Sequence, residues 1–274
     1  MSSSPTILVF DSGLGGLTVF REIAAARPDA RFIYAADDAF FPYGRHGEAR
    51  LVERVLAVIG ELTLSQHPDL VVIACNTAST LVLPQLRARF AIPFVGTVPA
   101  IKPACASSKS KLVSVLGTEA TVAREYTRTL IAEYAQGCEV TLVGSRRLAV
   151  LAEASLYGEK ISDADIAEEI KPCFVEKDGA HTDTIALACT HYPLLIDRLK
   201  ALSPWPVEWI DPAPAIARRV VELLGPPTSE APAEPARFIL TSGKVPSRAL
   251  SASLARFGVA PTDAAAFDTS AQSP

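Results

Sequence analysis

The feature that most constrains the fold of this chain is an alternation of short apolar runs with longer helix-like stretches. Most of the runs are continuously apolar, which is typical of strands buried on both faces of a parallel sheet. The sequence predicts strands at residues 7–10, 31–34, 70–74, 112–116, 139–143, 184–188, 207–210 and 238–240. It predicts helices between them, at residues 17–26, 48–66, 80–90, 121–135, 163–175, 194–201 and 213–224. Alternating β and α units indicate an α/β fold with parallel sheets.

The number of strands favours two doubly wound α/β domains. The chain has 274 residues, of which 49% are hydrophobic, and this is enough for one large core or two modest ones. We expect the first domain to comprise residues 1–98 plus 210–274 and the second to comprise residues 99–209. Residues 225–236 are rich in Pro, Ala and Glu and predict a surface connection, while the tail after Ala260 is expected to be partly disordered.

Composition argues against several classes of function. The 26 basic and 30 acidic side chains give a net charge of −4 without a basic block, so nucleic acid is not an expected partner. The N-terminus lacks a basic segment, and the apolar run at residues 7–10 is too short for a signal peptide or a membrane span. We therefore expect a cytoplasmic protein with no membrane partner. Five cysteines without a C-x-x-C pair, and only four histidines, predict neither a disulfide framework nor a metal site.

Two cysteines occupy matching positions in the pattern. Cys75 follows the apolar run at residues 70–73, and Cys189 follows the one at 185–187; small hydrogen-bonding side chains come directly after each. Thiols at equivalent ends of two similar strands suggest a pair that faces one substrate from opposite sides. Stereochemical inversion at a carbon requires a planar carbanion flanked by two such acid/base groups. A thiol before a helix N-terminus also meets free N–H groups and the positive end of the helix dipole, which stabilise thiolate.

Other interpretations of the cysteines explain less. A lone cysteine is usually a small buried hydrophobe, which is the better interpretation of Cys105, Cys138 and Cys173. A thiol hydrolase could use Cys189 with His191 as activator, but this leaves Cys75 unexplained. Two facing thiols could also form a redox pair. Two-base proton transfer accounts best for the matched positions.

A glycine-rich loop follows the first predicted strand, with the sequence Asp11-Ser12-Gly13-Leu14-Gly15-Gly16. Dinucleotide binding through G-x-G-x-x-G would need glycine where Thr18 stands, and no Walker-A run is present. A strand-to-helix turn capped by Asp11 and a substrate-binding loop remain equally open. A second loop, Phe41-Pro42-Tyr43-Gly44, follows the second strand and is expected to reach the same sheet edge.

Four blocks together resemble the glutamate racemases of the aspartate/glutamate racemase family. They span most of the chain in the family's order and are residues 11–18 (DSGLGGLT), 41–44 (FPYG), 74–79 (ACNTAS) and 189–195 (CTHYPLL). The segments at 209–212 and 241–243 resemble the family too. The resemblance implies an amino-acid racemase without a cofactor, with its active site in the cleft between two α/β domains. It implies a bacterial role in supplying D-glutamate for peptidoglycan, hence in cell-wall biogenesis and cell shape.

The resemblance also assigns roles to residues. Cys75 is expected to act on D-glutamate and Cys189 on L-glutamate, with Asp11 and His191 adjusting their protonation. Asp37 and Glu153 are weaker candidates, because Asp37 is expected to cap a loop and Glu153 to lie on a helix face. The substrate-binding residues would be Asp11, Ser12, Tyr43, Gly44, Asn76, Thr77, Thr190 and His191. The family often forms homodimers, but the sequence leaves the oligomeric state and regulation by cell-wall precursors open.

The chain departs from the family pattern at a few positions. Ala188 stands where glycine usually precedes the second cysteine, and Asp38 and Phe40 stand where Thr or Asn and arginine are usual. These changes affect the rim of the site and leave both cysteines intact. Aspartate racemases usually carry glutamate where His191 stands, so His191 favours glutamate as substrate. A ligand-binding module of the periplasmic-receptor type is a rival, but it would need a signal peptide and no reactive thiols.

Overall fold

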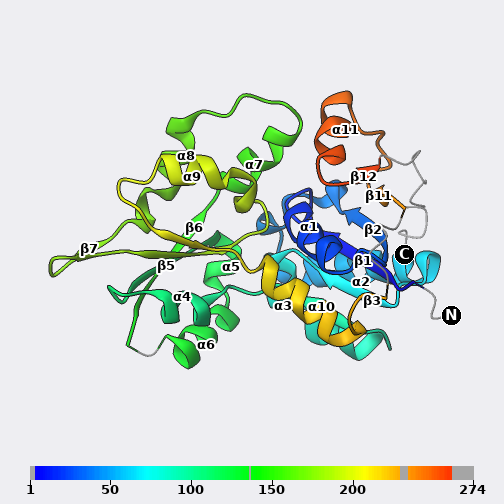
Figure 1. Cartoon of the computed structure of the whole chain (residues 1–274), viewed down its shortest axis with the longest axis horizontal. Coiled ribbons are helices and arrows are strands. Elements are labelled where there is room, and N and C mark those ends of the chain that lie inside the picture. The colour runs from blue at the N-terminus through cyan, green and yellow to red at the C-terminus, as the bar shows by residue number, and fades with distance from the viewer. Residues whose placement is uncertain (1–3, 136, 229–233, 261–274) are drawn as a thin grey trace.

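The computed structural model describes residues 4–135, 137–228 and 234–260. It contains two parallel sheets in two lobes that lie side by side (Figure 1), so the predicted α/β class with two parallel sheets is confirmed. The tail after residue 260, predicted to be partly disordered, lies outside the described residues, as do residues 229–233 of the predicted surface connection.

The first sheet has the strand order β12-β11-β2-β1-β3-β4. All of its paired strands are parallel. Its strands are β1 (Thr6–Asp11), β2 (Arg31–Ala36), β3 (Leu70–Ile73), β4 (Phe94–Gly96), β11 (Ala236–Leu240) and β12 (Val259–Ala260). The helices of this domain are α1 (Leu17–Ala26), α2 (Glu48–Gln66), α3 (Asn76–Arg89), α10 (Ala213–Leu224) and α11 (Arg248–Ala255), with short 3₁₀ turns η1 (Asp38–Phe40) and η2 (Tyr43–Arg45).

Side chains of β1 alternate between two cores. Ile7 and Val9 pack with residues of α1, α10 and α11, whereas Leu8 and Phe10 pack with residues of α2 and α3. Each face of the central strand is therefore covered by helices, which is why its sequence is continuously apolar. In such a sheet, ligands bind at the carboxyl ends of the strands.

The second sheet has the order β10-β9-β5-β6 and is also parallel. Its strands are β5 (Leu112–Thr118), β6 (Glu139–Ser145), β9 (Thr184–Ala188) and β10 (Glu208–Ile210), and a separate hairpin joins β7 (Glu176–Lys177) to β8 (Ala180–His181). The helices are α4 (Ile101–Ser107), α5 (Glu119–Ala123), α6 (Glu125–Tyr134), α7 (Leu148–Leu156), α8 (Asp163–Ile170) and α9 (Ile196–Ala201), with 3₁₀ turns η3 (Lys171–Cys173) and η4 (Tyr192–Leu195).

The chain passes between the sheets twice, from β4 to α4 and from β10 back to α10. Ile210 pairs with Ala186 in the second sheet, and Ala213 already packs in the core of the first. The boundaries at 98/99 and 209/210 remain our proposal for the domain division. Within the described residues, no helix is both long and apolar enough to cross a membrane.

Candidate active site

Two thiols from different sheets border one small cavity. Cys75 lies between β3 and α3, and Cys189 directly follows β9. Both side chains are buried. All of the predicted site residues except Asp11 line this cavity, as do Phe41, Pro42, Thr118 and Ala149, which the sequence did not single out for a role of their own. The cavity measures about 20 Å³, roughly the space that one water molecule occupies.

Cys75 lies in surroundings that favour the neutral thiol. Its Sγ donates to Ser12 Oγ at 3.5 Å. Burial, and next the negative charge of Asp11, raise the pKa of Cys75 to about 12, although the Ala78 N–H favours the thiolate. The expected stabilisation of the Cys75 thiolate by an N–H group of the helix N-terminus is therefore present, but burial and Asp11 outweigh it and the pKa rises.

Cys189 belongs to a chain of three side chains. Its Sγ lies 3.9 Å from His191 Nδ1, and His191 Nε2 lies 2.7 Å from Glu153 Oε2. Burial alone would lower the pKa of His191, but the contacts with Cys189 and Glu153 outweigh burial and raise that pKa well above its usual value. A doubly protonated imidazole donates through both nitrogens. This series of side chains therefore places a cation beside the Cys189 sulfur. The turn after Cys189 is 3₁₀ rather than α-helical, so this cation replaces the helix N-terminus expected there.

Glu153 is closer to the chemistry than the sequence suggested. It lies on α7, a helix that the sequence pattern did not predict, and only 7% of the residue is exposed. Besides its contact with His191, Oε2 accepts the backbone N–H of Leu14 at 2.9 Å. The expectation that Glu153 lies on a helix face is correct, but that face is turned into the site. No local motif surrounds Glu153, so only the packing of α7 could reveal it.

Asp37 has a different place from Glu153. It is fully buried and accepts hydrogen bonds from the Arg54 guanidinium, from Tyr43 Oη at 2.7 Å and from Thr241 Oγ1 at 2.6 Å. Asp37 therefore fixes the loop that carries Gly44, without lining the cavity. The Tyr43 hydroxyl proton is therefore committed to Asp37, so Tyr43 does not donate that proton to a substrate in this arrangement.

Asp11 links the two domains behind the cavity. Its Oδ2 accepts the Gly13 N–H at 3.0 Å, and its Oδ1 accepts the Thr190 hydroxyl at 3.2 Å. Thr18 Oγ1 also donates to the Thr190 carbonyl at 3.3 Å. Asp11 thus combines a loop-fixing contact with a charge close enough to affect Cys75.

Glycines stand in this loop where the second domain approaches the backbone closely. A Cβ at Gly15 would lie 2.3 Å from His191 Nδ1, and a Cβ at Gly13 would lie 2.9 Å from a Glu153 oxygen. Neither position has room for any side chain. Asp11 fixes the turn through the Gly13 N–H, Ser12 of the loop lines the cavity, and the side chains that the loop accommodates come from the other domain.

The remaining cavity residues offer neutral hydrogen-bonding groups. Neither the amide nitrogen nor the amide oxygen of Asn76 has a partner among the described residues, although both are buried. Thr77 Oγ1 lies 3.1 Å from Thr118 Oγ1 and 3.2 Å from Thr121 Oγ1, across the two domains. An unpaired buried amide is costly, so Asn76 indicates a place for a polar ligand.

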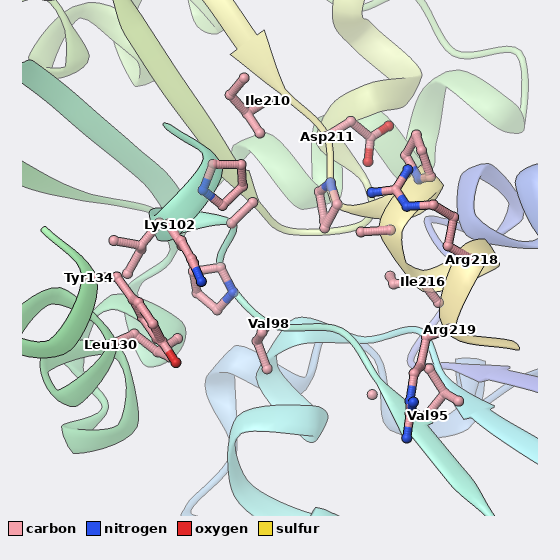
Figure 2. Close-up of a pocket in the computed structure, with 18 of the residues that line it drawn as sticks. Val95, Val98, Lys102, Leu130, Tyr134, Ile210, Asp211, Ile216, Arg218 and Arg219 are labelled. Carbon is pink, nitrogen blue, oxygen red and sulfur yellow. The ribbon is translucent and has the colours of Figure 1, made fainter. Parts of the chain in front are cut away.

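A second cavity lies away from the thiols. It measures about 510 Å³ and lies along the two interdomain crossovers, where Val98, Lys102, Ile216 and Arg219 surround it (Figure 2). None of the predicted site residues lines it. Within the described part of the chain, no three His, Cys, Asp or Glu side chains are grouped so that they could hold a metal ion.

Comparison with known proteins gives a consistent result. The family model described as Asp/Glu/Hydantoin racemase matches residues 12–220. A glutamate racemase of Brucella anthropi is 57% identical over 221 residues, covering 80% of each chain. The crystal structure of Escherichia coli glutamate racemase with L-glutamate and the activator UDP-MurNAc-Ala has a TM-score of 0.85 at 40% identity, over 93% of this chain and 96% of that one. That of Francisella tularensis glutamate racemase with D-glutamate has a TM-score of 0.73 at 25% identity, over 94% of each.

Proposed function

The chain belongs to the Asp/Glu/hydantoin racemase family, and from that premise we propose that it interconverts L- and D-glutamate by proton transfer between two cysteines. The relatives that match it over most of their length are glutamate racemases, so the chain is an isomerase of this kind. The observation that carries the mechanism is the presence of Cys75 and Cys189, each at the end of a strand in a different domain, on one buried cavity.

The unequal surroundings of the thiols support a starting protonation state. The raised pKa of Cys75 keeps it a thiol, whereas Cys189 Sγ lies 3.9 Å from Nδ1 of His191, whose raised pKa favours the imidazolium cation. In this state Cys189 is the base and Cys75 is the acid. The resting enzyme is therefore ready for L-glutamate, the enantiomer expected to meet Cys189.

In the forward direction, Cys189 thiolate removes the Cα proton of L-glutamate and becomes a thiol. The electron pair left on Cα forms a carbanion delocalised into the α-carboxylate. The Cys75 thiol then donates its proton to the opposite face, which gives D-glutamate and leaves Cys75 as thiolate. Reaction of D-glutamate reverses each step. The enzyme returns to its starting state when the two sulfurs exchange protons with solvent.

The difficult step is removal of a proton far less acidic than a thiol, whose unperturbed pKa is about 8.5. Preorganised donors in a site that excludes water can stabilise the developing carbanion. We propose that Ser12, Asn76, Thr77 and Thr190, with the backbone of residues 43–44, hold the carboxylates and amine. A cavity of about 20 Å³ cannot admit glutamate, so substrate entry requires the walls to separate and then close.

We further propose that the product D-glutamate supplies peptidoglycan synthesis in the cytoplasm, and that the chain acts without a cofactor. Growth of a D-glutamate auxotroph that expresses this chain tests the cellular role. The homodimer stays a prediction, which sedimentation analysis of the pure protein can check.

The direct test of function is circular dichroism of glutamate incubated with pure protein, with EDTA and without pyridoxal phosphate. We expect the signal of either enantiomer to decay to that of the racemate. Cys75→Ala and Cys189→Ala should each abolish the decay, because each leaves one face without a proton carrier. Cys138→Ala, which removes a half-buried thiol outside the cavity, should not. Faster turnover of aspartate than of glutamate would show that the substrate assignment is wrong.

A further inference from the structure

A third cavity adjoins the catalytic one and carries charges that the reaction does not use. It measures about 390 Å³ and lies between residues 42–45, 118–119 and 145–150; we call it the antechamber. It shares Pro42, Gly44, Thr118 and Ala149 with the catalytic cavity. The two cavities therefore have a common wall, and a molecule leaving the antechamber through that wall would arrive at the thiols.

Three arginines and one glutamate line the antechamber. Arg146 Nε lies 2.6 Å from Glu119 Oε1, and Arg147 pairs with three carboxylates of α8: Asp165 at 2.6 Å, Glu168 at 3.5 Å and Glu169 at 4.0 Å. The Arg45 guanidinium has no ion-pair or hydrogen-bond partner in the part of the chain that the structure describes. Arg45 is also the residue directly after Gly44, on the loop that Asp37 fixes. The charge of Arg45 is therefore not paired with a carboxylate, and it lies next to Gly44 in the wall of the catalytic cavity.

The size and charge of the antechamber complement an acidic amino acid. A cavity of about 390 Å³ admits a molecule as small as glutamate whole, which the catalytic cavity of about 20 Å³ does not. Glutamate carries two carboxylates and one ammonium group. Of the three guanidinium groups of the lining, those of Arg146 and Arg147 are paired with carboxylates, and that of Arg45 is the one available to a ligand carboxylate. Guanidinium groups bind carboxylates well because their N–H donors form a planar fork.

We propose that the antechamber is a staging site that binds the substrate, an amino acid with two carboxylates, before the catalytic cavity opens, and that Arg45 is its principal carboxylate ligand. The proposal rests on the proposed function, since it takes the substrate to be acidic. It adds a binding step that none of the catalytic residues performs. The unpaired charge of Arg45 would attract the anion to the wall that it must pass.

The test compares charge variants at Arg45 with a matched control. Arg45→Ala should raise the KM for L-glutamate about threefold and Arg45→Glu about tenfold, because an attractive charge is removed and then reversed near the site, while kcat changes less than KM. Arg45→Lys should lie close to the native enzyme. Arg248→Ala removes an equal charge from an exposed position on α11 and should leave both constants unchanged.

Two further readouts separate steering from structural damage. The KM of the native enzyme should rise with ionic strength, and that dependence should be weaker in Arg45→Ala. Glutarate, a dicarboxylate that cannot be racemised, should bind Arg45→Ala about threefold more weakly in calorimetry. A native enzyme that racemises glutamate but has the same KM, salt dependence and glutarate affinity as Arg45→Ala and Arg45→Glu would overturn the staging site. A native protein without racemase activity would instead overturn the proposed function.

Discussion

His191 Nε2 lies 2.7 Å from Glu153 Oε2, and these two residues are only 2% and 7% exposed. The same imidazole faces Cys189 through Nδ1. A buried carboxylate on α7 therefore acts on the thiol of Cys189 through the ring between them. This makes Glu153 a positioning residue, since it contacts His191 and the backbone of Leu14 but does not line the catalytic cavity.

Replacement of Glu153 tests this relay by pH dependence. Glu153→Gln keeps the shape but removes the charge that helps to raise the pKa of His191, so His191 should lose its proton at a lower pH. The high-pH limb of kcat for L-glutamate should then move to lower pH, with kcat above neutrality reduced about 10- to 100-fold. Glu222→Gln, at an exposed ion pair on α10, is the control. A pH profile that is identical in Glu153→Gln and native protein would remove Glu153 from the mechanism.

The separate tasks of Asp11 and His191 predict unequal effects on the two directions. His191→Asn should mainly slow L-to-D turnover, through Cys189. Asp11→Asn removes the charge that helps to raise the pKa of Cys75, so it should change kcat unequally in the two directions through that thiol. Each loss of kcat should be about 10- to 1000-fold. Because enantiomers have equal free energies, kcat/KM must stay equal in the two directions, so the asymmetry must appear in kcat itself. Equal losses of kcat in both directions for both variants would show that neither residue serves one thiol.

The closeness of the glycine loop to His191 gives a steric prediction. Gly15→Ala would place a Cβ 2.3 Å from His191 Nδ1, so the ring or the loop must shift. Displacement of a catalytic group by about 1 Å can cost about 100-fold in rate, and we expect a loss of kcat of that order. Gly47→Ala is the matched control, because nothing lies within 4 Å of its Cβ and its φ of −65° suits alanine. Near-native activity in Gly15→Ala would contradict the close packing of the two domains.

A buried ion pair outside the site predicts the response to acid. Arg27 Nε lies 2.8 Å from Asp29 Oδ1, and Asp29 also accepts from Thr228. The Arg27 hydrogen bonds lower the pKa of Asp29, although burial opposes them. The stabilisation is therefore present above the unfolded pKa of about 3.9 and is lost as pH falls through the lowered folded pKa.

Urea unfolding at neutral pH measures how much the Arg27–Asp29 pair contributes to the free energy of unfolding. Asp29→Asn leaves Arg27 buried without a counter-charge, so the free energy of unfolding should fall by about 3–5 kcal/mol. Glu22→Gln, in the exposed pair with Arg21, should cost about 1 kcal/mol or less. A change in Asp29→Asn as small as that in Glu22→Gln would mean that the pair is not buried in solution.

Local pattern predicted much of the fold. Helices α1, α2 and α10 have the bounds that periodicity predicts, and the predicted strands all occur, since buried parallel strands are continuously apolar. The two-residue strands β7, β8 and β12 were too short to stand out, and the three-residue strand β4 was not predicted, although β10 is equally short and was. Helix α3 begins at Asn76, four residues before the predicted start, and Cys75 is its N-cap residue, without a side-chain capping hydrogen bond.

Much of the site was also visible in the sequence, because its residues follow strands whose carboxyl ends meet. The exceptions are residues whose role depends on packing across the domains. Glu153 reaches His191 because α7 packs against η4, and the Tyr43 hydroxyl donates to Asp37. Neither relationship has a signature in local sequence.

The most direct test of the two-thiol mechanism is the fate of the Cα hydrogen in deuterated water. If Cys189 removes the proton and Cys75 supplies another, D-glutamate formed early from unlabelled L-glutamate should carry deuterium at Cα. The remaining L-glutamate should stay largely unlabelled, because Cys189 holds the abstracted proton on its own face. Mass spectrometry of the separated enantiomers measures both. Substantial retention of the original hydrogen in D-glutamate would show that one base serves both faces and would contradict the mechanism.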